Sequence, residues 1–492
     1  FLGMWIPDLF MKRVEESAAH RKAHPTDMEF ANWSLFCPRD APGLHEAYGD
    51  EFEALYAKYE SEGLTRRRVD AMSLMQRIIQ IQVVSGVPYM LYKDTVNKLS
   101  NQQHLGPIRL SNLCTEIVEY TEPGEEIAVC NLVSIALPRF VRSDKTIDYD
   151  DLGDVVRMAV RSLNHVIDIN AYPVEKSKKS NLRHRPIGIG VQGMADLFIA
   201  MGLPFESDEA IEANRKIFET MYFHAVSESC ELAKTMGKHE SFDGSPLSRG
   251  RFHWQLHQDV FDGDPISKDA NGDELLPWGE LRTNVCEYGT RNSLFIAPMP
   301  TASTAQILGN SEGLEAIQSM IFSRKVLSGE FQVVNGPLLE CLISKGLWND
   351  DMRRSLIRDG GSVQNLQVDD STKALFKTAW EIKQRRVLDM ASARAPFIDQ
   401  SASLNIYVRT PEPNIMFNIH MYGWKAGLKT GMYYLRSQSE AQASRAVINS
   451  APSTTPSTTP STTPSTTDNS HTSDPEEAVT CRKMEGCVMC GS

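Results

Sequence analysis

The pattern of hydrophobic and polar residues predicts a long folded body in which helices alternate with strands. Apolar side chains recur at helical spacing in five segments: Asp50–Glu62, Ala71–Ser85, Asp151–Ile169, Asp208–Thr235 and Thr372–Ala391. Short runs with a strand-like pattern lie between them: Ala128–Leu137, Ile187–Val191, Ser293–Pro298 and Ser403–Val408. Strands that alternate with helices favour an α/β architecture with parallel strands.

The pattern changes after about residue 445. Residues Pro452–Thr467 are four copies of Pro-Ser-Thr-Thr, a composition that cannot bury a core and is typical of extended, flexible chain. We therefore expect three parts: a folded body over 1–445, a flexible Pro/Ser/Thr-rich linker over 446–480, and a short cysteine-bearing tail over 481–492.

Composition and charge narrow the function classes. The chain has 492 residues, of which 41% are hydrophobic and 23% charged, values typical of globular proteins. A net charge of −12 argues against binding to nucleic acid or to anionic membranes. We find no run of 18 apolar residues, so we expect no membrane span. Nine scattered cysteines fit a reducing cytoplasm.

The first candidate site is Asn112-Leu113-Cys114-Thr115-Glu116. In an extended segment, side chains at i, i+2 and i+4 share one face, so this spacing would present an amide, a thiol and a carboxylate to one substrate. A buried structural cysteine with two solvated polar neighbours is the alternative. Cys130 opens a strand-like run, and a turn near Pro123 could bring it towards Cys114. A small buried hydrophobic residue is the alternative there.

The second candidate site is the segment Pro300–Thr304. It follows a strand-like run and precedes a possible helix start, where Pro, Ser and Thr are favoured. Hydroxyls together with free N–H groups at a helix start can bind phosphate. An ordinary helix cap remains the alternative.

Two residue pairs suggest redox chemistry. The adjacent Tyr433 and Tyr434 could pass a radical by short hops, although packing on a strand is the simpler interpretation. Cys487 and Cys490 form a Cys-x-x-Cys pair that could relay two electrons through a disulfide. A zinc site completed by Cys481 and His471 is the alternative, but we favour redox chemistry because a flexible tail is a poor place for a stable metal site.

The segment Gly188–Gly193 matches G-x-G-x-x-G. A dinucleotide-binding fold also needs a full strand before this motif and an acid at a strand end about 20 residues later. Neither is present, so we do not expect a dinucleotide site here.

Taken together, several stretches resemble the large, catalytic subunit of class I ribonucleotide reductase of the eukaryotic type. They are Trp5–Glu15, Pro88–Asp94, Ser111–Glu119, Arg183–Gly193, Asn292–Asn310, Trp424–Arg436 and the final Cys-x-x-Cys-Gly-Ser. The resemblance runs from the first residue to about residue 440 and resumes in the last dozen. It implies the second half of a ten-stranded β/α barrel with a finger loop, followed by a disordered C-terminal tail.

The family reduces ribonucleoside diphosphates to deoxyribonucleotides. The resemblance implies that Cys114 becomes a thiyl radical, that Glu116 is the general base and that Asn112 holds the substrate hydroxyls. Cys130 matches one of the two thiols that reduce the substrate. The implied substrate-binding residues are Ser111, Asn112, Glu116, Pro300, Thr301, Ala302, Ser303 and Thr304, the last five around the phosphates.

The resemblance also implies the partners. Tyr433 and Tyr434 match tyrosines that carry the radical from the diiron-tyrosyl centre of the small subunit. Cys487 and Cys490 match the tail pair that re-reduces the active site and is itself reduced by thioredoxin or glutaredoxin. The family forms homodimers. We expect no metal and no cofactor bound directly by this chain.

In the family, ATP and dATP effectors bind in an N-terminal part that precedes the point where this sequence begins. We therefore expect an N-terminally incomplete large subunit that does not turn over by itself with thioredoxin, since the second active-site thiol is in that part. A catalytically incomplete fragment that only binds the small subunit is the alternative function.

Overall fold

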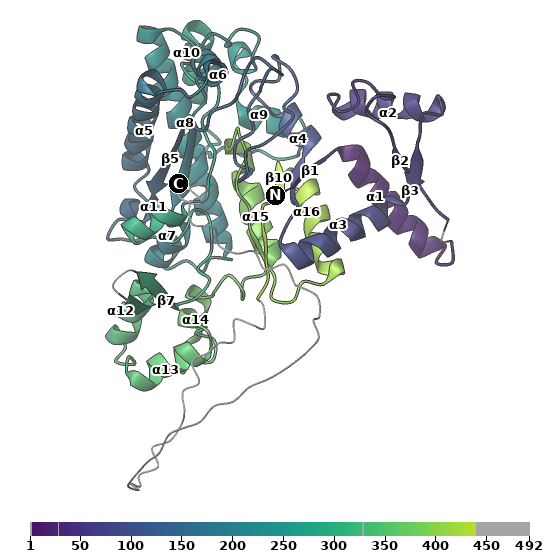
Figure 1. Cartoon of the computed structure of the whole chain (residues 1–492). Helices are drawn as coiled ribbons and strands as arrows, with labels where there is room; N and C mark the ends of the chain where they lie inside the picture. Colours follow the sequence, from purple (N-terminus) through teal and green to yellow (C-terminus); the bar gives the residue numbers. More distant parts are fainter. Residues whose placement is uncertain (1, 28, 327–328, 439–492) are drawn as a thin grey trace, which may run out of the picture.

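The centre of the fold is a sheet that joins segments from both ends of the described chain (Figure 1). The computed structural model describes residues 2–27, 29–326 and 329–438. The sheet has the order β1 (Gly3–Ile6), β4 (Tyr89–Tyr92) and β10 (Thr430–Met432). Strand β1 runs parallel to β4, whereas β10 runs antiparallel to β4. Both edges of β4 are therefore paired.

Two further strand pairs are parallel, which confirms the predicted α/β architecture. Strand β5 (Leu132–Ala136) pairs with β6 (Gly188–Gln192), and β9 (Ile406–Tyr407) pairs with β11 (Leu435–Arg436). A parallel bridge between Ile189 and Ile296 adds the run before Pro298 to β6. In β6, a Cβ at Gly188 would lie 2.6 Å from Leu132 and one at Gly190 would lie 2.7 Å from Met299. These glycines allow close strand packing.

The largest core lies where helices cover β5 and β6. Helix α5 places Val156, Val160, Leu163 and Ile167 on one buried face, the spacing of an amphipathic helix. The helices on this side are α5 (Tyr149–Ile169), α6 (Glu175–His184), α7 (Met194–Met201), α8 (Asp208–Met236), α9 (His253–Gln258) and α10 (Trp278–Tyr288). In Figure 1, α5 and α8 run beside β5.

A second core lies around β1, β4 and β10. Its helices are α1 (Asp8–Ala23), α3 (Ala71–Ser85), α15 (Gln384–Arg394) and α16 (Pro413–Lys425). Neighbouring elements are α2 (Gly49–Ser61), α4 (Lys93–Lys98) and the antiparallel strands β2 (Trp33–Leu35) and β3 (Arg67–Val69). Short 3-10 turns cover Leu137–Phe140, Leu247–Arg249 and Ala395–Phe397.

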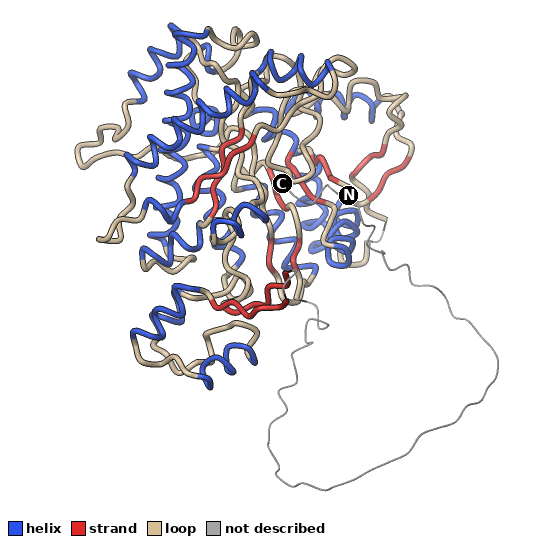
Figure 2. Tube along the Cα trace, turned by 60° about the vertical axis from the view of Figure 1, so that its left-hand side comes forward, coloured by secondary structure: helices blue, strands red, loops and turns tan. Residues whose placement is uncertain are grey.

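A smaller lobe extends from one end of the body (Figures 1 and 2). It contains the hairpin of β7 (Ile321–Val326) and β8 (Gly329–Val334), with α12 (Gly336–Ser344), α13 (Asp350–Arg358) and α14 (Asp370–Leu375). Met320, Leu338, Leu342 and Phe376 belong to its own core. Helix α11 (Ala302–Leu308) belongs to the main body.

The single helix predicted over Thr372–Ala391 was wrong, because the chain leaves helical geometry between α14 and α15. The N–H of Ala379 donates to the carbonyl of Ile317 at 2.8 Å, and that of Thr378 donates to the Glu381 carboxylate at 2.8 Å. These backbone N–H groups therefore have acceptors that do not belong to a helix. The apolar spacing that predicted a helix here belongs to a buried loop.

The predicted C-terminal parts and the closed barrel stay predictions. The linker 446–480 and the tail 481–492 lie outside the described residues. Closure of a barrel also stays a prediction, since the strands of the described ranges pair as one three-stranded and four two-stranded sheets. None of the helices in those ranges combines the length and apolar character needed to cross a bilayer.

Candidate active site

Cys114 lies in a tight turn, residues 112–117, which we call the cysteine turn. The N–H of Asn112 donates to the Ile117 carbonyl at 3.1 Å, and the N–H of Thr115 donates to the Asn112 carbonyl at 3.3 Å. Thr115 has a φ of +69°, which is rare for a residue with a branched side chain. The extended segment predicted here was therefore wrong, because the backbone hydrogen bonds close a turn instead.

The turn still brings the predicted amide and carboxylate together. Asn112 Nδ2 donates to Glu116 Oε1 at 2.7 Å, and Asn112 Oδ1 accepts from the N–H of Ile117 at 3.2 Å. Glu116 is only 2% exposed, and burial raises the pKa of its carboxyl. A raised pKa makes a carboxylate a stronger base, which suits proton abstraction from a hydroxyl near neutral pH.

One of the two predicted tyrosines, Tyr433, contacts the thiol directly, and Tyr434 packs against Tyr433. Tyr433 Oη lies 3.4 Å from Cys114 Sγ, and the rings of Tyr433 and Tyr434 are 4.2 Å apart between centroids, at 53°. The N–H of Tyr433 donates to the Leu404 carbonyl at 2.7 Å. Burial raises the pKa of the Tyr433 phenol, so it carries its proton at neutral pH. Tyr434, Tyr433 and the Cys114 thiol thus follow one another in contact, in that order.

A segment that the sequence did not identify as functional, residues 400–403, holds the cysteine turn in place. Ser403 Oγ donates to the Cys114 carbonyl at 2.5 Å, and the N–H of Ser401 donates to the Glu116 carbonyl at 2.9 Å. On its other side, the N–H of Ser403 donates to the Pro298 carbonyl at 3.1 Å. The segment therefore connects the cysteine turn to the strand-like run that leads to Thr301.

Lys429 supports this segment from behind. Its ammonium donates to the carbonyls of Asp399 and Gln400 at 2.7 Å each and to that of Ile398 at 3.1 Å, and it lies 2.8 Å from His253 Nε2. Burial lowers the pKa of Lys429 to about 7. Sequence reasoning missed Lys429, although it is the only charged residue in the stretch Leu428–Leu435, and that isolation was a signal.

The hydroxyl-rich segment begins a helix, as predicted, but its cap differs. Thr301 occupies the N-cap position of α11 without a side-chain capping bond; its Oγ1 accepts instead from the N–H of Gly313 at 2.7 Å. Ala302, Ser303 and Thr304 are exposed at the start of α11, where the first N–H groups of a helix have no partner within it. Pro300 immediately precedes this helix start.

Ser111 and Cys130 flank the turn in sequence. Ser111 Oγ donates to the Asn112 carbonyl at 2.9 Å. Although the Cys130 side chain is exposed, surrounding protein atoms desolvate its thiol and raise the pKa to about 12, helped by Glu119, Glu116 and Cys114. This electrostatic contact supports the predicted approach of Cys130 to Cys114. Cys37, Cys130, Cys230, Cys286 and Cys341 are free thiols.

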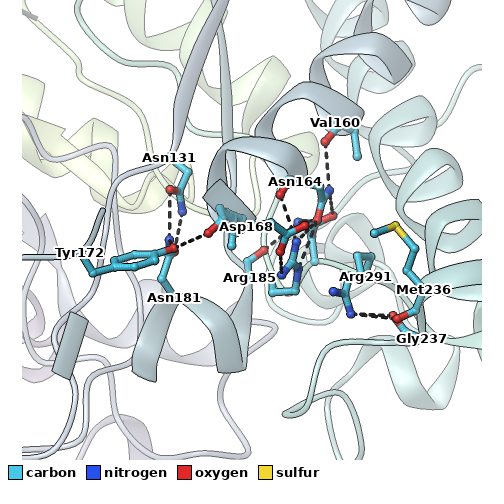
Figure 3. Close-up of polar contacts among 12 residues, drawn as sticks. Asn131, Val160, Asn164, Asp168, Tyr172, Asn181, Arg185, Met236, Gly237 and Arg291 are labelled. Carbon is cyan, nitrogen blue, oxygen red and sulfur yellow. Dashed lines mark hydrogen bonds and ion pairs between the residues drawn. The ribbon is translucent and has the colours of Figure 1, made fainter. Parts of the chain in front are cut away.

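The residue after Cys130 is fixed by a buried amide network. Asn131 Nδ2 donates to Asn181 Oδ1 at 2.6 Å and to the Pro186 carbonyl at 2.8 Å. Asn181 Nδ2 in turn contacts Tyr172 Oη at 2.6 Å, as Figure 3 shows. Because Asn131 lies between Cys130 and β5, this network fixes the position of the backbone that carries the Cys130 thiol. Sequence reasoning missed it, since the partners are about 50 residues apart.

The remaining predicted residues lie elsewhere. Cys487 and Cys490, with the alternative zinc partners Cys481 and His471, are outside the described residues. Within the described ranges, no group of three or more His, Cys, Asp or Glu side chains is arranged to hold a metal ion. Two cavities next to the site are lined partly by Ser401 and Ser403, but neither lining includes Cys114 or Thr301.

Comparisons with known proteins agree with one family. The family described as "Ribonucleotide reductase, barrel domain" matches residues 1–434. The chain is 47% identical to the "Ribonucleoside-diphosphate reductase large subunit" of Caenorhabditis elegans and 48% identical to that of Danio rerio, covering 100% of this chain in both cases. It spans 57% and 59% of the length of these two relatives.

A solved structure supports the fold. The Actinobacillus ureae class Id ribonucleotide reductase alpha subunit aligns with a TM-score of 0.57 at 26% identity, over 75% of this chain and 61% of that one.

Proposed function

Since the chain belongs to the ribonucleotide reductase large-subunit family, whose barrel-domain description matches residues 1–434, we propose that it serves the radical-based reduction of ribonucleoside diphosphates to 2′-deoxyribonucleoside diphosphates. The reducing electrons would come from thioredoxin or glutaredoxin. The single observation that carries the proposal is the placement of Cys114 Sγ 3.4 Å from Tyr433 Oη, with the Asn112–Glu116 pair in the same turn.

In the proposed reaction, a thiyl radical at Cys114 takes the 3′ hydrogen atom of the ribose and becomes a thiol. Glu116 accepts the proton of the 3′ hydroxyl, and Asn112 holds the sugar hydroxyls. A dithiol that includes Cys130 would become a disulfide and supply two electrons and two protons. One proton leaves with the 2′ hydroxyl as water, the other becomes the new hydrogen at C2′, and Glu116 returns its proton to the 3′ oxygen. Return of the hydrogen atom from Cys114 to C3′ regenerates the thiyl radical.

The radical would arrive through Tyr434 and Tyr433. The small subunit's diiron-tyrosyl centre supplies it in the family, and each hop moves one electron together with a phenolic proton. The 4.2 Å ring separation and the 3.4 Å contact to sulfur support this order. Cys487 and Cys490 would re-reduce the active-site disulfide by thiol–disulfide exchange.

The substrate's diphosphate would bind at the start of α11. Ser303 and Thr304 offer exposed hydroxyls there and Ala302 begins the first turn, after Pro300 and the buried Thr301. The ribose end would lie against Ser111 and the cysteine turn. Ser403 supports this arrangement, because it hydrogen-bonds both the Cys114 carbonyl and the Pro298 carbonyl at 3.1 Å. This chain would bind no metal directly.

We also propose the finer architecture and assembly on the basis of family membership. Residues 1–445 would form the second half of a ten-stranded β/α barrel, with 446–480 as linker and 481–492 as redox tail. The partners would be the small subunit and a second large subunit, in the cytoplasm. ATP and dATP effectors would bind outside this half barrel.

The test replaces the thiol that the proposal makes indispensable. Cys114→Ser in the complete large subunit, assayed with the small subunit and a dithiol reductant, should abolish deoxynucleotide formation while substrate binding persists. Cys286→Ser, at an exposed thiol, is the matched control and should keep activity. Turnover by the Cys114→Ser protein would refute the proposal. It would also revive the alternative of a chain that only binds the small subunit.

A further inference from the structure

A partly open cavity lies behind the cysteine turn, between α15 and β10. Its volume is about 40 Å³, enough for a small ion. The lining is Leu99, Ala391, Arg394, Ala395, Ile398, Gln400, Ser401, Ala402, Leu404, Gly427, Leu428, Lys429 and Thr430. The lining is therefore apolar apart from a few hydroxyl and amide groups and two cations, and it contains no Asp or Glu.

Arg394 brings an unpaired charge into this cavity. Its side chain is 3% exposed, and its hydrogen bonding within the described chain consists of one long contact, 3.3 Å from Nη1 to Asn214 Oδ1. Nε is buried without a partner. The guanidinium also lies 6.0 Å from the Phe218 ring centroid. Burial lowers its pKa to about 9 with no contribution from any carboxylate.

The neighbouring charges do not neutralise Arg394. Lys429 is a cation as well, and its ammonium is used by three carbonyls and His253. The nearby carboxylate of Asp399 accepts the N–H groups of Phe295 and Ile296 at 2.9 and 2.7 Å. The carbonyl end of α15 offers only a partial negative charge of about half a unit. A net positive charge therefore remains.

A buried cation without a partner costs several kcal/mol, and a pKa of about 9 leaves Arg394 charged at neutral pH. We propose that the cavity binds a small monovalent anion, of the size of chloride or a short carboxylate, against the Arg394 guanidinium. The apolar walls disfavour large polar ligands, and the guanidinium, whose Nε has no partner, can form charge-assisted hydrogen bonds with an anion. The proposal is independent of the proposed function.

The site adjoins the support of the cysteine turn. Gln400 Oε1 accepts from the N–H of Val118 at 3.2 Å, the N–H of Ser401 donates to Glu116 O at 2.9 Å, and Thr430 Oγ1 donates to the Thr115 carbonyl at 3.2 Å. All three lining residues thus hold the turn. An anion in the cavity would reduce the mobility of the lining residues that hold the cysteine turn.

Trifluoroacetate, observed by fluorine NMR, is a suitable probe in solution. With the wild-type protein, its signal should broaden and then sharpen again as chloride is added, whereas neutral trifluoroacetamide should show no broadening. Arg394→Met should reduce the broadening at least tenfold. Arg385→Met, an exposed position on the same helix, is the matched control and should leave it unchanged. Equal broadening by the two variants, or none with wild type, would overturn the proposal.

A second measurement needs no variant, in case Arg394→Met does not fold. Crystals of the wild-type protein soaked in bromide should show an anomalous peak in hydrogen-bonding distance of the Arg394 guanidinium. An ordered water there without anomalous signal would mean that solvent alone fills the cavity, and the anion site would be rejected.

Discussion

Tyr433 Oη and Cys114 Sγ are 3.4 Å apart, although the two residues are 319 positions apart in the chain. Each is held by the same short segment: Leu404 accepts the N–H of Tyr433 at 2.7 Å, and the Ser403 hydroxyl donates to the Cys114 carbonyl. Two adjacent residues therefore set the distance between phenol and thiol. Hydrogen-atom exchange between these groups would require no rearrangement of the backbone.

Removing that phenolic hydroxyl should stop radical transfer while sparing the fold. In Tyr433→Phe, the loss of a proton-transfer group should lower turnover by about 10²-fold or more. One lost hydrogen bond should change stability by only about 1 kcal/mol. Turnover with the small subunit and urea unfolding are the two measurements. Tyr288→Phe, at a partly exposed tyrosine, should change neither, and a fully active Tyr433→Phe would exclude the direct contact.

The buried carboxyl of Glu119 should make stability depend on pH. Burial raises its pKa from 4.5 to about 8, so between these values the folded protein retains a proton that the unfolded chain has lost. The free energy of unfolding should therefore fall as pH rises through this window, by up to about 1.4 kcal/mol per pH unit.

Glu119→Gln keeps the shape and removes the charge, so its unfolding free energy should be flatter between pH 5 and 8 than that of wild type. Urea unfolding at these two pH values measures the difference. Glu274→Gln, at an exposed position, should retain the wild-type slope. Parallel pH profiles for wild type and Glu119→Gln would show that this carboxyl is ionised in the folded state.

The amide network behind Cys130 should control that thiol. Asn181→Leu removes the 2.6 Å acceptor of Asn131 Nδ2, which keeps the Pro186 carbonyl, and one lost hydrogen bond in a buried network costs about 1 kcal/mol. We expect lower stability in urea and faster alkylation of Cys130, because the start of β5 becomes less ordered. Lys178→Leu, exposed on the same helix, should alter neither quantity. An unchanged alkylation rate in Asn181→Leu would separate the network from the thiol.

Two glycines with similar backbones should respond differently to alanine. Gly193 (φ +76°) and Gly309 (φ +74°) both occupy the left-handed region, where a side chain costs about 1 kcal/mol. A Cβ at Gly193 would also lie 2.7 Å from Pro138 Cδ, whereas a Cβ at Gly309 would meet nothing within 4 Å. Gly193→Ala should therefore be the more destabilising in urea. Equal midpoints would contradict the close approach of Pro138.

The sequence predicted helices well where residues next to the helix supply the caps at both of its ends. Helix α3 was predicted over Ala71–Ser85, and it has those bounds. Asp70 accepts the N–H of Met72 at its start, and Gly86 adopts φ +77° at its end. The helix predicted across residues 376–383 failed because the partner that satisfies the backbone there, the Ile317 carbonyl, is remote in sequence.

The candidate site shows the same division. The spacing of Asn112, Cys114 and Glu116 grouped residues that share one turn, but it predicted an extended segment where hydrogen bonds close that turn. The supports at Ser403 and Tyr433 are 289 and 319 residues away from Cys114, so no pattern of spacing could join them to it. Only the family resemblance related Tyr433 to Cys114.

The central sheet has a consequence for how this protein is made. Strand β10, which leads directly into Tyr433, has β4 as its partner, and β4 is also paired with β1. A ribosome must therefore release almost the entire described polypeptide before the last strand can dock and the phenol can meet the sulfur. Such distant pairing slows folding, so chains interrupted during synthesis should hold a turn with its thiol but no route for the radical to reach it.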